Sequence, residues 1–81
     1  MTSELIHSKL QTIFRDVFDD NTLVIARITN ADDVSGWDSL AQINLVVAIE
    51  NDFAITLSLE DMATLSNVGD MLDLIQSKIA T

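Results

Sequence analysis

The chain of 81 residues contains no cysteine and no proline, and it has only two glycines and one histidine. Without cysteine there can be no disulfide bond, no thiolate metal site and no thiol nucleophile of its own. The two glycines stand far apart, so a glycine-rich phosphate loop is absent. The single histidine, His7, cannot form a metal-binding cluster, and we expect it to be solvated or packed. These absences indicate that the protein has no metal site, and that it is a substrate of enzymes and not itself an enzyme.

Basic side chains are also scarce, because 4 lysines and arginines face 13 aspartates and glutamates, for a formal net charge of −9. This excludes nucleic acid as a partner, since its phosphates require lysine and arginine. A strong field of one sign favours basic protein partners instead. The acids between residues 19 and 33 do not predict a calcium site, because the segment lacks the central glycine and closing glutamate of an EF-hand loop.

Long apolar runs are the third absence. Ser3, Glu4, His7 and Lys9 interrupt the start of the chain, so no signal peptide is predicted. No apolar stretch approaches the ~20 residues that a membrane-spanning helix needs. We therefore expect a soluble, monomeric protein in the cytoplasm, without membrane insertion. The short chain leaves no room for a second core, so residues 1–81 are expected to form one domain.

What the chain does have is apolar residues at helical spacing. Spacings of three and four predict helices at about residues 3–18, 39–52, 58–64 and 68–79. Ser58, and Ser66 or Asn67, are the expected N-caps of the third and fourth helices. Residues 19–38 show no periodicity, and connections of this length are often functional. The pattern predicts an all-α fold, a small four-helix bundle with a long first loop and a short third helix.

The second predicted helix carries two apolar stripes. One is expected to face the core and consists of Leu45, Val46, Ile49 and Phe53. The other lies on a nearly opposite side, is called the outer stripe below, and consists of Leu40, Ile43 and Val47. Full burial of this helix is one explanation, but four short elements cannot wrap a helix completely. We expect the outer stripe, together with Met62 of the third helix, to be an exposed partner-binding surface.

The segment Gly36-Trp37-Asp38-Ser39-Leu40 places a serine hydroxyl where the second helix begins. Ser39 is at or next to the N-cap, so a phosphate attached to it would meet free backbone N–H groups and the positive end of the helix dipole. An ordinary serine cap after an acidic residue would have the same sequence. Asp38 and Ser39 are not by themselves a base–nucleophile pair, because sequence neighbours seldom reach the geometry that attack requires.

Trp37, just before this motif, has two interpretations. As a structural residue it would close the first loop against the bundle. As a functional residue it would contact an attached group or a partner, since indole is a frequent interface anchor. We favour the structural role. Gly69, near the start of the fourth helix, costs helix propensity and has no functional explanation in the sequence.

An Asp-Ser-Leu tripeptide that opens such a helix in a small acidic chain resembles the attachment site of the acyl carrier protein family. The resemblance runs from about Leu5 to Ile79, nearly the whole chain. Further matching segments are Ile28-Thr29 ahead of Asp32-Asp33 and Val34, Ala48-Ile49-Glu50-Asn51-Asp52-Phe53, and Leu65-Ser66-Asn67-Val68-Gly69-Asp70.

The resemblance implies that a phosphopantetheinyl transferase moves phosphopantetheine from coenzyme A onto Ser39, which Asp38 and Leu40 flank. The thiol of this arm would then hold acyl groups as thioesters. It also implies that acyl-loading, condensing and acyl-transferring enzymes are the partners, and that they meet the helix after the serine.

Two residues depart from the family's pattern. Carriers of general fatty-acid synthesis usually have acids just after Ser-Leu and along this helix, where this chain has Ala41 and Asn44. The departure favours a specialised fatty-acid or polyketide-type pathway. An aminoacyl or peptidyl carrier, for peptide synthesis or alanylation, uses the same fold and serine and is an alternative. A third possibility is a helical interaction domain in which Ser39 is never modified.

Overall fold

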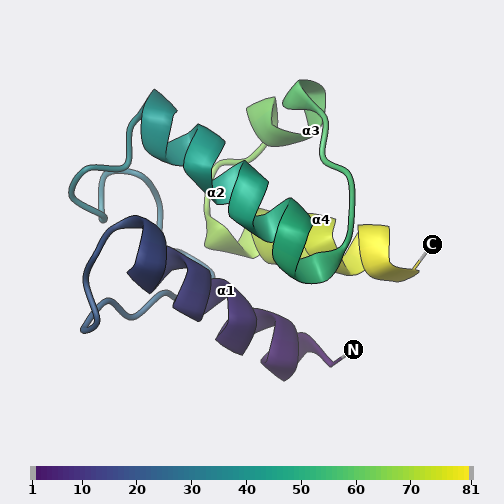
Figure 1. Cartoon of the computed structure of the whole chain (residues 1–81), viewed down its shortest axis with the longest axis horizontal. Helices are drawn as coiled ribbons and strands as arrows, with labels where there is room; N and C mark the ends of the chain where they lie inside the picture. Colours follow the sequence, from purple (N-terminus) through teal and green to yellow (C-terminus); the bar gives the residue numbers. More distant parts are fainter. Residues whose placement is uncertain (1, 81) are drawn as a thin grey trace.

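The computed structural model describes residues 2–80, apart from the side chains of residues 59 and 80, and the secondary structure of this range is helical. The helices are α1 (Ser3–Val17), α2 (Ser39–Phe53), α3 (Leu59–Ala63) and α4 (Val68–Ala80). α1 and α2 run antiparallel, α4 packs against α1, and the short α3 lies between α2 and α4 in the chain (Figure 1). The predicted four-helix bundle is confirmed, with helix ends within one residue of those expected.

Short polar side chains cap the helices where the sequence predicts them. At α3, Ser58 and Asp61 form the reciprocal pair of a capping box. At α4, the Asn67 side chain accepts a hydrogen bond from the Asp70 N–H at 2.9 Å. The Asp70 carboxylate accepts from the Ser66 N–H at 3.0 Å, so it bonds one residue earlier than in a standard capping box. These local contacts determine where the third and fourth helices begin.

The core is formed by the inward faces of all four helices, with one residue each from the first loop and the α2–α3 connector. Its members are Ile6, Leu10, Ile13, Phe14, Ile25, Leu45, Ile49, Phe53, Leu57, Met62, Val68, Met71, Leu72 and Ile75. Full burial of each large apolar side chain contributes about 1.5–3 kcal/mol. Packing therefore stabilises helices that would be marginal alone at these lengths. In the described range, no helix has both the length and the apolar character needed to cross a membrane.

Met62 belongs to this core and not to an exposed surface. Its side chain is only 8% exposed and packs among the buried residues of the bundle. α3 has only five residues. Because Met62 points from this short helix into the core, it cannot also face solvent. The expectation that Met62 is part of an exposed partner surface is wrong.

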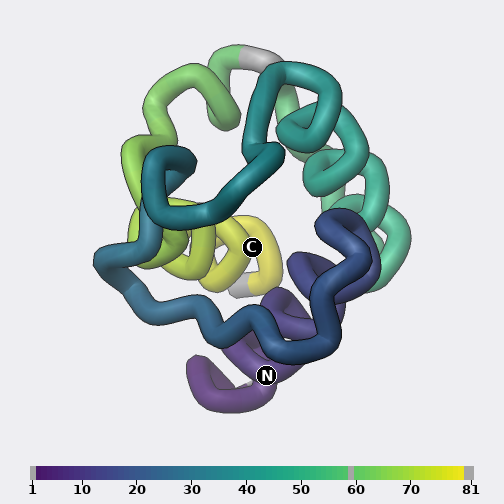
Figure 2. The backbone as a smooth tube through the Cα atoms, turned by 90° about the vertical axis from the view of Figure 1, so that its left-hand side faces the viewer, coloured from purple at the N-terminus to yellow at the C-terminus, as the bar shows by residue number. Residues whose placement is uncertain are grey.

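The first loop crosses one face of the molecule from the end of α1, past the start of α4, to α2 (Figure 2). Polar side chains of α1 hold its backbone at Ile25. His7 Nε2 lies 2.9 Å from the Ile25 carbonyl oxygen, and Gln11 Oε1 accepts from the Ile25 N–H at 3.2 Å. Because both peptide groups are satisfied, this irregular segment can bury the Ile25 side chain in the core.

A second anchor joins the loop to the first turn of α4. The N–H groups of Val68 and Gly69 donate to the carbonyls of Thr29 and Arg27, both at 2.8 Å. A Cβ on Gly69 would lie 3.0 Å from the Arg27 carbonyl oxygen. Glycine is therefore needed for this close approach of two backbones. The Arg27 side chain adds an exposed ion pair with Asp73 at 2.9 Å, and this hydrogen bond raises the pKa of Arg27.

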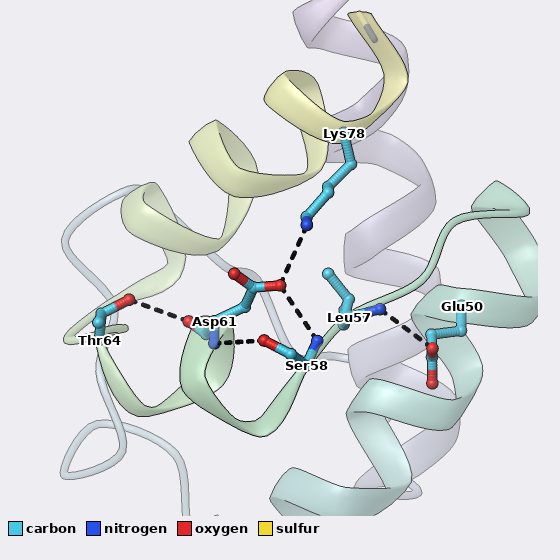
Figure 3. A network of polar contacts seen from close by, with 6 residues as sticks. All are labelled: Glu50, Leu57, Ser58, Asp61, Thr64 and Lys78. Carbon is cyan, nitrogen blue, oxygen red and sulfur yellow. Dashed lines mark hydrogen bonds and ion pairs between the residues drawn. The ribbon is translucent and has the colours of Figure 1, made fainter.

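Polar contacts attach α3 and its connector to the neighbouring helices (Figure 3). The Asp61 carboxylate accepts from the Ser58 N–H at 3.1 Å and lies 3.2 Å from Lys78 Nζ of α4. The bond from Ser58 and then the contact with Lys78 lower the pKa of Asp61. On the other side of the connector, Glu50 of α2 accepts from the Leu57 N–H at 3.1 Å. The short helix is thus linked to both α2 and α4.

Candidate functional site

A turn at the end of the first loop determines where α2 begins. Gly36 has a φ of +87°, a conformation that residues with a Cβ rarely adopt. The Trp37 N–H donates to the Val34 carbonyl at 3.2 Å, and the Asp38 N–H donates to the Gly36 carbonyl at 3.0 Å. Val34 is buried, which anchors the turn to the rest of the molecule. The chain then enters the helix at Ser39.

Asp38 is the N-cap of α2. Its backbone is extended (φ −114°, ψ −169°), and its carboxylate accepts a hydrogen bond from the Ala41 N–H at 2.9 Å. Its carbonyl accepts the first helical bond, from the Gln42 N–H at 2.9 Å. The role of Asp38 in this structure is therefore to hold Ser39 at the first position of the helix.

Ser39 presents an accessible hydroxyl at this position. Its side chain is exposed and hydrogen-bonds to no described residue. The N–H groups of Ser39 and Leu40 precede the Gln42 N–H, which is the first helical donor, so they have no partner within α2. An anion on the Ser39 oxygen would lie beside these donors and at the positive end of the helix dipole. The hydroxyl is therefore in a position suited to carry a phosphate.

Trp37 packs on an aromatic cluster beneath this turn. Its ring centroid lies 5.2 Å from that of Phe14 in an edge-to-face arrangement, and 6.3 Å from that of Phe18. The indole N–H donates to Gln42 Oε1 at 2.7 Å. The side chain thus connects the loop to both α1 and α2, and the structural interpretation of Trp37 is confirmed.

A shallow depression lies beside Ser39, between the first loop and the first turn of α2. It is lined by Ala31, Trp37, Asp38, Ser39, Gln42 and Ile43. Ala31 and Gln42 were not expected from the sequence as neighbours of the serine. The spacing alone could have revealed Gln42, because residues three apart lie on one face of a helix. Ala31 carried no such signal, since its place depends on the path of the loop.

The outer stripe continues along α2 from Ser39 and is exposed. Leu40, Ile43 and Val47 are 67%, 58% and 52% exposed. No charged side chain precedes Glu50 on this helix. The structure therefore places the serine hydroxyl and three exposed apolar side chains on one side of α2, and exposed apolar patches are common at binding sites. The part played by these residues in partner binding stays a prediction.

The other chemistry-bearing groups lie apart from this surface. Within residues 2–80, no cluster of histidines and acids could hold a metal ion. Hydrogen bonds with Thr22 lower the pKa of Asp20, which lies in the first loop. The shifted pKa values of Asp20, Arg27 and Asp61 arise from structural hydrogen bonds, and none of these residues lines the depression beside Ser39.

Known proteins share this sequence pattern over almost the whole chain. Residues 8–75 match the family described as "Phosphopantetheine attachment site". An acyl carrier protein from Thermosynechococcus vestitus is 31% identical over 81 residues, which cover 99% of each chain. The chain belongs to the acyl carrier protein family. Another acyl carrier protein, from Cyanidium caldarium, is 37% identical over 82 residues, covering 98% of this carrier and 92% of that one.

The fold of this carrier is also found among solved structures. The solution structure of a holo acyl carrier protein from Geobacter metallireducens matches with a TM-score of 0.87 and 43% identity, over 93% of this chain and 86% of that one. The prosthetic group of the carrier is covalently attached phosphopantetheine. The unbonded Ser39 hydroxyl, the two free N–H groups and the adjoining depression fit such a group.

Proposed function

We propose that Ser39 is the residue that holds phosphopantetheine, and that the carrier presents acyl intermediates as thioesters on the thiol of this arm. The exposed, unbonded hydroxyl at the first residue of α2 is the observation that carries the proposal. In the transfer, the Ser39 oxygen forms the new bond to phosphorus and the nucleotide part of coenzyme A leaves. The hydroxyl proton passes to a base of the transferase. The carrier is then a substrate of its partners and not an enzyme.

Intact mass after incubation with coenzyme A and a permissive phosphopantetheinyl transferase tests this assignment. Wild type should gain one arm, and Ser39→Ala should gain none. Ser35→Ala is the matched control, because Ser35 is an exposed serine just before the same helix, and this variant should gain the arm. A modified Ser39→Ala would place the site elsewhere. No gain in any of the three would favour an unmodified helical interaction domain.

We propose further that the outer stripe binds the transferase and the acyl-loading, condensing and acyl-transferring enzymes. Its exposure and its continuity with Ser39 support this. Val47→Glu should raise the Kd for the transferase about tenfold or more, as expected for an apolar contact at an interface. The matched control is Val24→Glu, the same change at a valine of the first loop that is 70% exposed. Equal losses in both variants would show that added charge, and not the stripe, weakens binding.

A specialised fatty-acid or polyketide-type pathway is the proposed setting, in the cytoplasm. Asn44 is exposed and neutral, while Ala41 is buried, so the surface after Ser39 lacks the acids found in carriers of general fatty-acid synthesis. Releasing the cargo of the natively isolated carrier with hydroxylamine, and measuring its mass, would test this. An acyl hydroxamate whose mass differs from that of an ordinary saturated fatty acyl group supports the proposal, and one with such a mass would assign the carrier to general fatty-acid synthesis. An aminoacyl or peptidyl product would assign the carrier to peptide synthesis or alanylation.

A further inference from the structure

We infer that the depression beside Ser39 is a resting site for the phosphopantetheine arm, which lies there against Trp37, Gln42 and Ile43. The inference rests on attachment of the arm at Ser39. It assigns the arm a direction, toward the first loop and away from α3.

The depression begins at the attachment residue. Ser39 is itself part of the lining, and Ala31 of the first loop lies on the same hollow. Just beyond its phosphate, the arm carries a carbon with two methyl groups, which is its most apolar part. Ala31, Trp37 and Ile43 offer apolar surface where this carbon would lie if the arm turned toward the loop. Removing these groups from water favours the turned arm over an extended one.

Gln42 supplies a hydrogen-bond donor in the same place. The indole N–H of Trp37 can only donate, so Gln42 must turn its oxygen to Trp37 and its amide nitrogen elsewhere. This nitrogen hydrogen-bonds to no described residue. The arm has suitable acceptors in its phosphate oxygens and amide carbonyls. Gln42 follows Ser39 by three residues and therefore lies on the same face of α2.

Trp37 holds this site in place before the arm arrives. Its ring is packed edge-on against Phe14, and its bond to Gln42 restricts the amide. A site that is ordered in advance loses little further entropy on binding. An arm resting there would leave Leu40 and Val47 uncovered, since neither lines the depression. The carrier could then present Leu40 and Val47, two of the three residues of the outer stripe, to a partner while its arm is still folded back over Ile43.

Nuclear Overhauser effects in the holo protein test the inference. Intact mass first confirms that the arm is on Ser39, so a failure of the attachment proposal is recognised separately. We expect contacts between the arm's methyl protons and the indole of Trp37, the only tryptophan in the chain. Ile43→Ser should weaken or abolish these contacts. Val47→Ser, the same kind of loss one turn further along α2 and outside the depression, should retain them.

A second pair of variants tests the role of the Gln42 amide nitrogen as a hydrogen-bond donor to the arm. Gln42→Glu keeps an acceptor for Trp37 but replaces the amide nitrogen with a charge that repels the arm's phosphate, so the contacts should be lost. Asn44→Asp adds the same charge at an exposed position outside the depression and should retain them. Methyl contacts confined to Leu40 or to α3, or no contact with the protein at all, would overturn the inference. So would contacts that Ile43→Ser and Gln42→Glu leave unchanged.

Discussion

Gly69 couples the first loop to α4 through backbone contact alone. Replacing glycine by alanine in an exposed helix normally stabilises a protein by about 1 kcal/mol. Here the new Cβ would lie 3.0 Å from the Arg27 carbonyl oxygen, which also accepts the Gly69 N–H at 2.8 Å. We expect Gly69→Ala to lower the free energy of unfolding by about 1–3 kcal/mol, as overpacking does. Urea denaturation measures the change, and a gain in stability would contradict the prediction.

Gly36→Ala is the control at the other end of the loop. Nothing lies within 4 Å of a Cβ built there, but its φ of +87° is strained for alanine. We expect a loss of about 1–2 kcal/mol from backbone strain alone. Amide resonances of Arg27 and Thr29 separate the two causes, because crowding at Gly69 should shift them and strain at Gly36 should not.

At the scale of elements, the packing of the bundle buries one side of α2 and leaves the other side exposed. Ile49 is fully buried, whereas Val47 is 52% exposed. Ile49→Ala should lower the free energy of unfolding by about 2–5 kcal/mol, because it leaves a cavity in the core. Val47→Ala should change it by less than about 0.5 kcal/mol. Thermal or urea unfolding compares them, and equal losses would mean that the outer stripe is not free for partners.

The stability of α3, a helix of five residues, should depend on the ionisation of its capping residue Asp61. The Ser58 N–H and Lys78 lower the pKa of this carboxyl, so its charged form stabilises the fold. That stabilisation is complete above the unfolded pKa of about 3.9 and is lost as the pH falls through the lower folded pKa. Asp61→Asn should therefore be less stable than wild type at about pH 6, with the difference shrinking toward about pH 3. Melting temperatures across this range provide the measurement.

Asp16→Asn is the matched control for this experiment. It removes an exposed carboxylate of α1 that hydrogen-bonds to no described residue. It therefore reports what the loss of one negative charge does to a strongly acidic protein. A gap between wild type and Asp61→Asn that stays constant with pH, after this correction, would show that the Asp61 carboxylate does not stabilise α3 through its charge.

At the scale of the whole molecule, the net charge of −9 should govern how stability and partner binding respond to salt. With 13 acids against 4 bases, most carboxylates cannot have a basic partner. Salt limits their repulsion to a range of ~10 Å at 0.1 M, so the melting temperature should rise with moderate salt. Asp32→Asn should blunt the rise. This is a cleaner variant than Asp33→Asn, because the Asp33 carboxylate accepts from the Asn30 N–H at 3.1 Å. A flat or falling melting temperature would contradict the prediction.

The same charge should act in the opposite direction on binding. A field of one sign speeds encounter with a basic partner, so salt should slow association with the transferase more than it speeds dissociation. Stopped-flow rates over the same salt series measure both steps. An association rate that is indifferent to salt would mean that the outer stripe selects the partner without electrostatic attraction.

The order and ends of the helices, and the place of Ser39 at the start of α2, were determined by the sequence itself. The reason is that periodicity and capping are local: Ser58 with Asp61 and Asn67 with Asp70 act within one turn. The buried and open sides of α2 could be assigned because its two stripes differ and few elements are available to cover them.

Only the tertiary structure decided which side chains meet across elements. Met62 had to close the core beneath α3, although its apolar character alone suited an exposed surface equally well. Gly69 is needed because the Arg27 backbone, distant in sequence, passes over α4. The depression beside Ser39 includes Ala31 only because the first loop returns there. Burial and close approach depend on what arrives from elsewhere in the chain, and no local pattern contains that information.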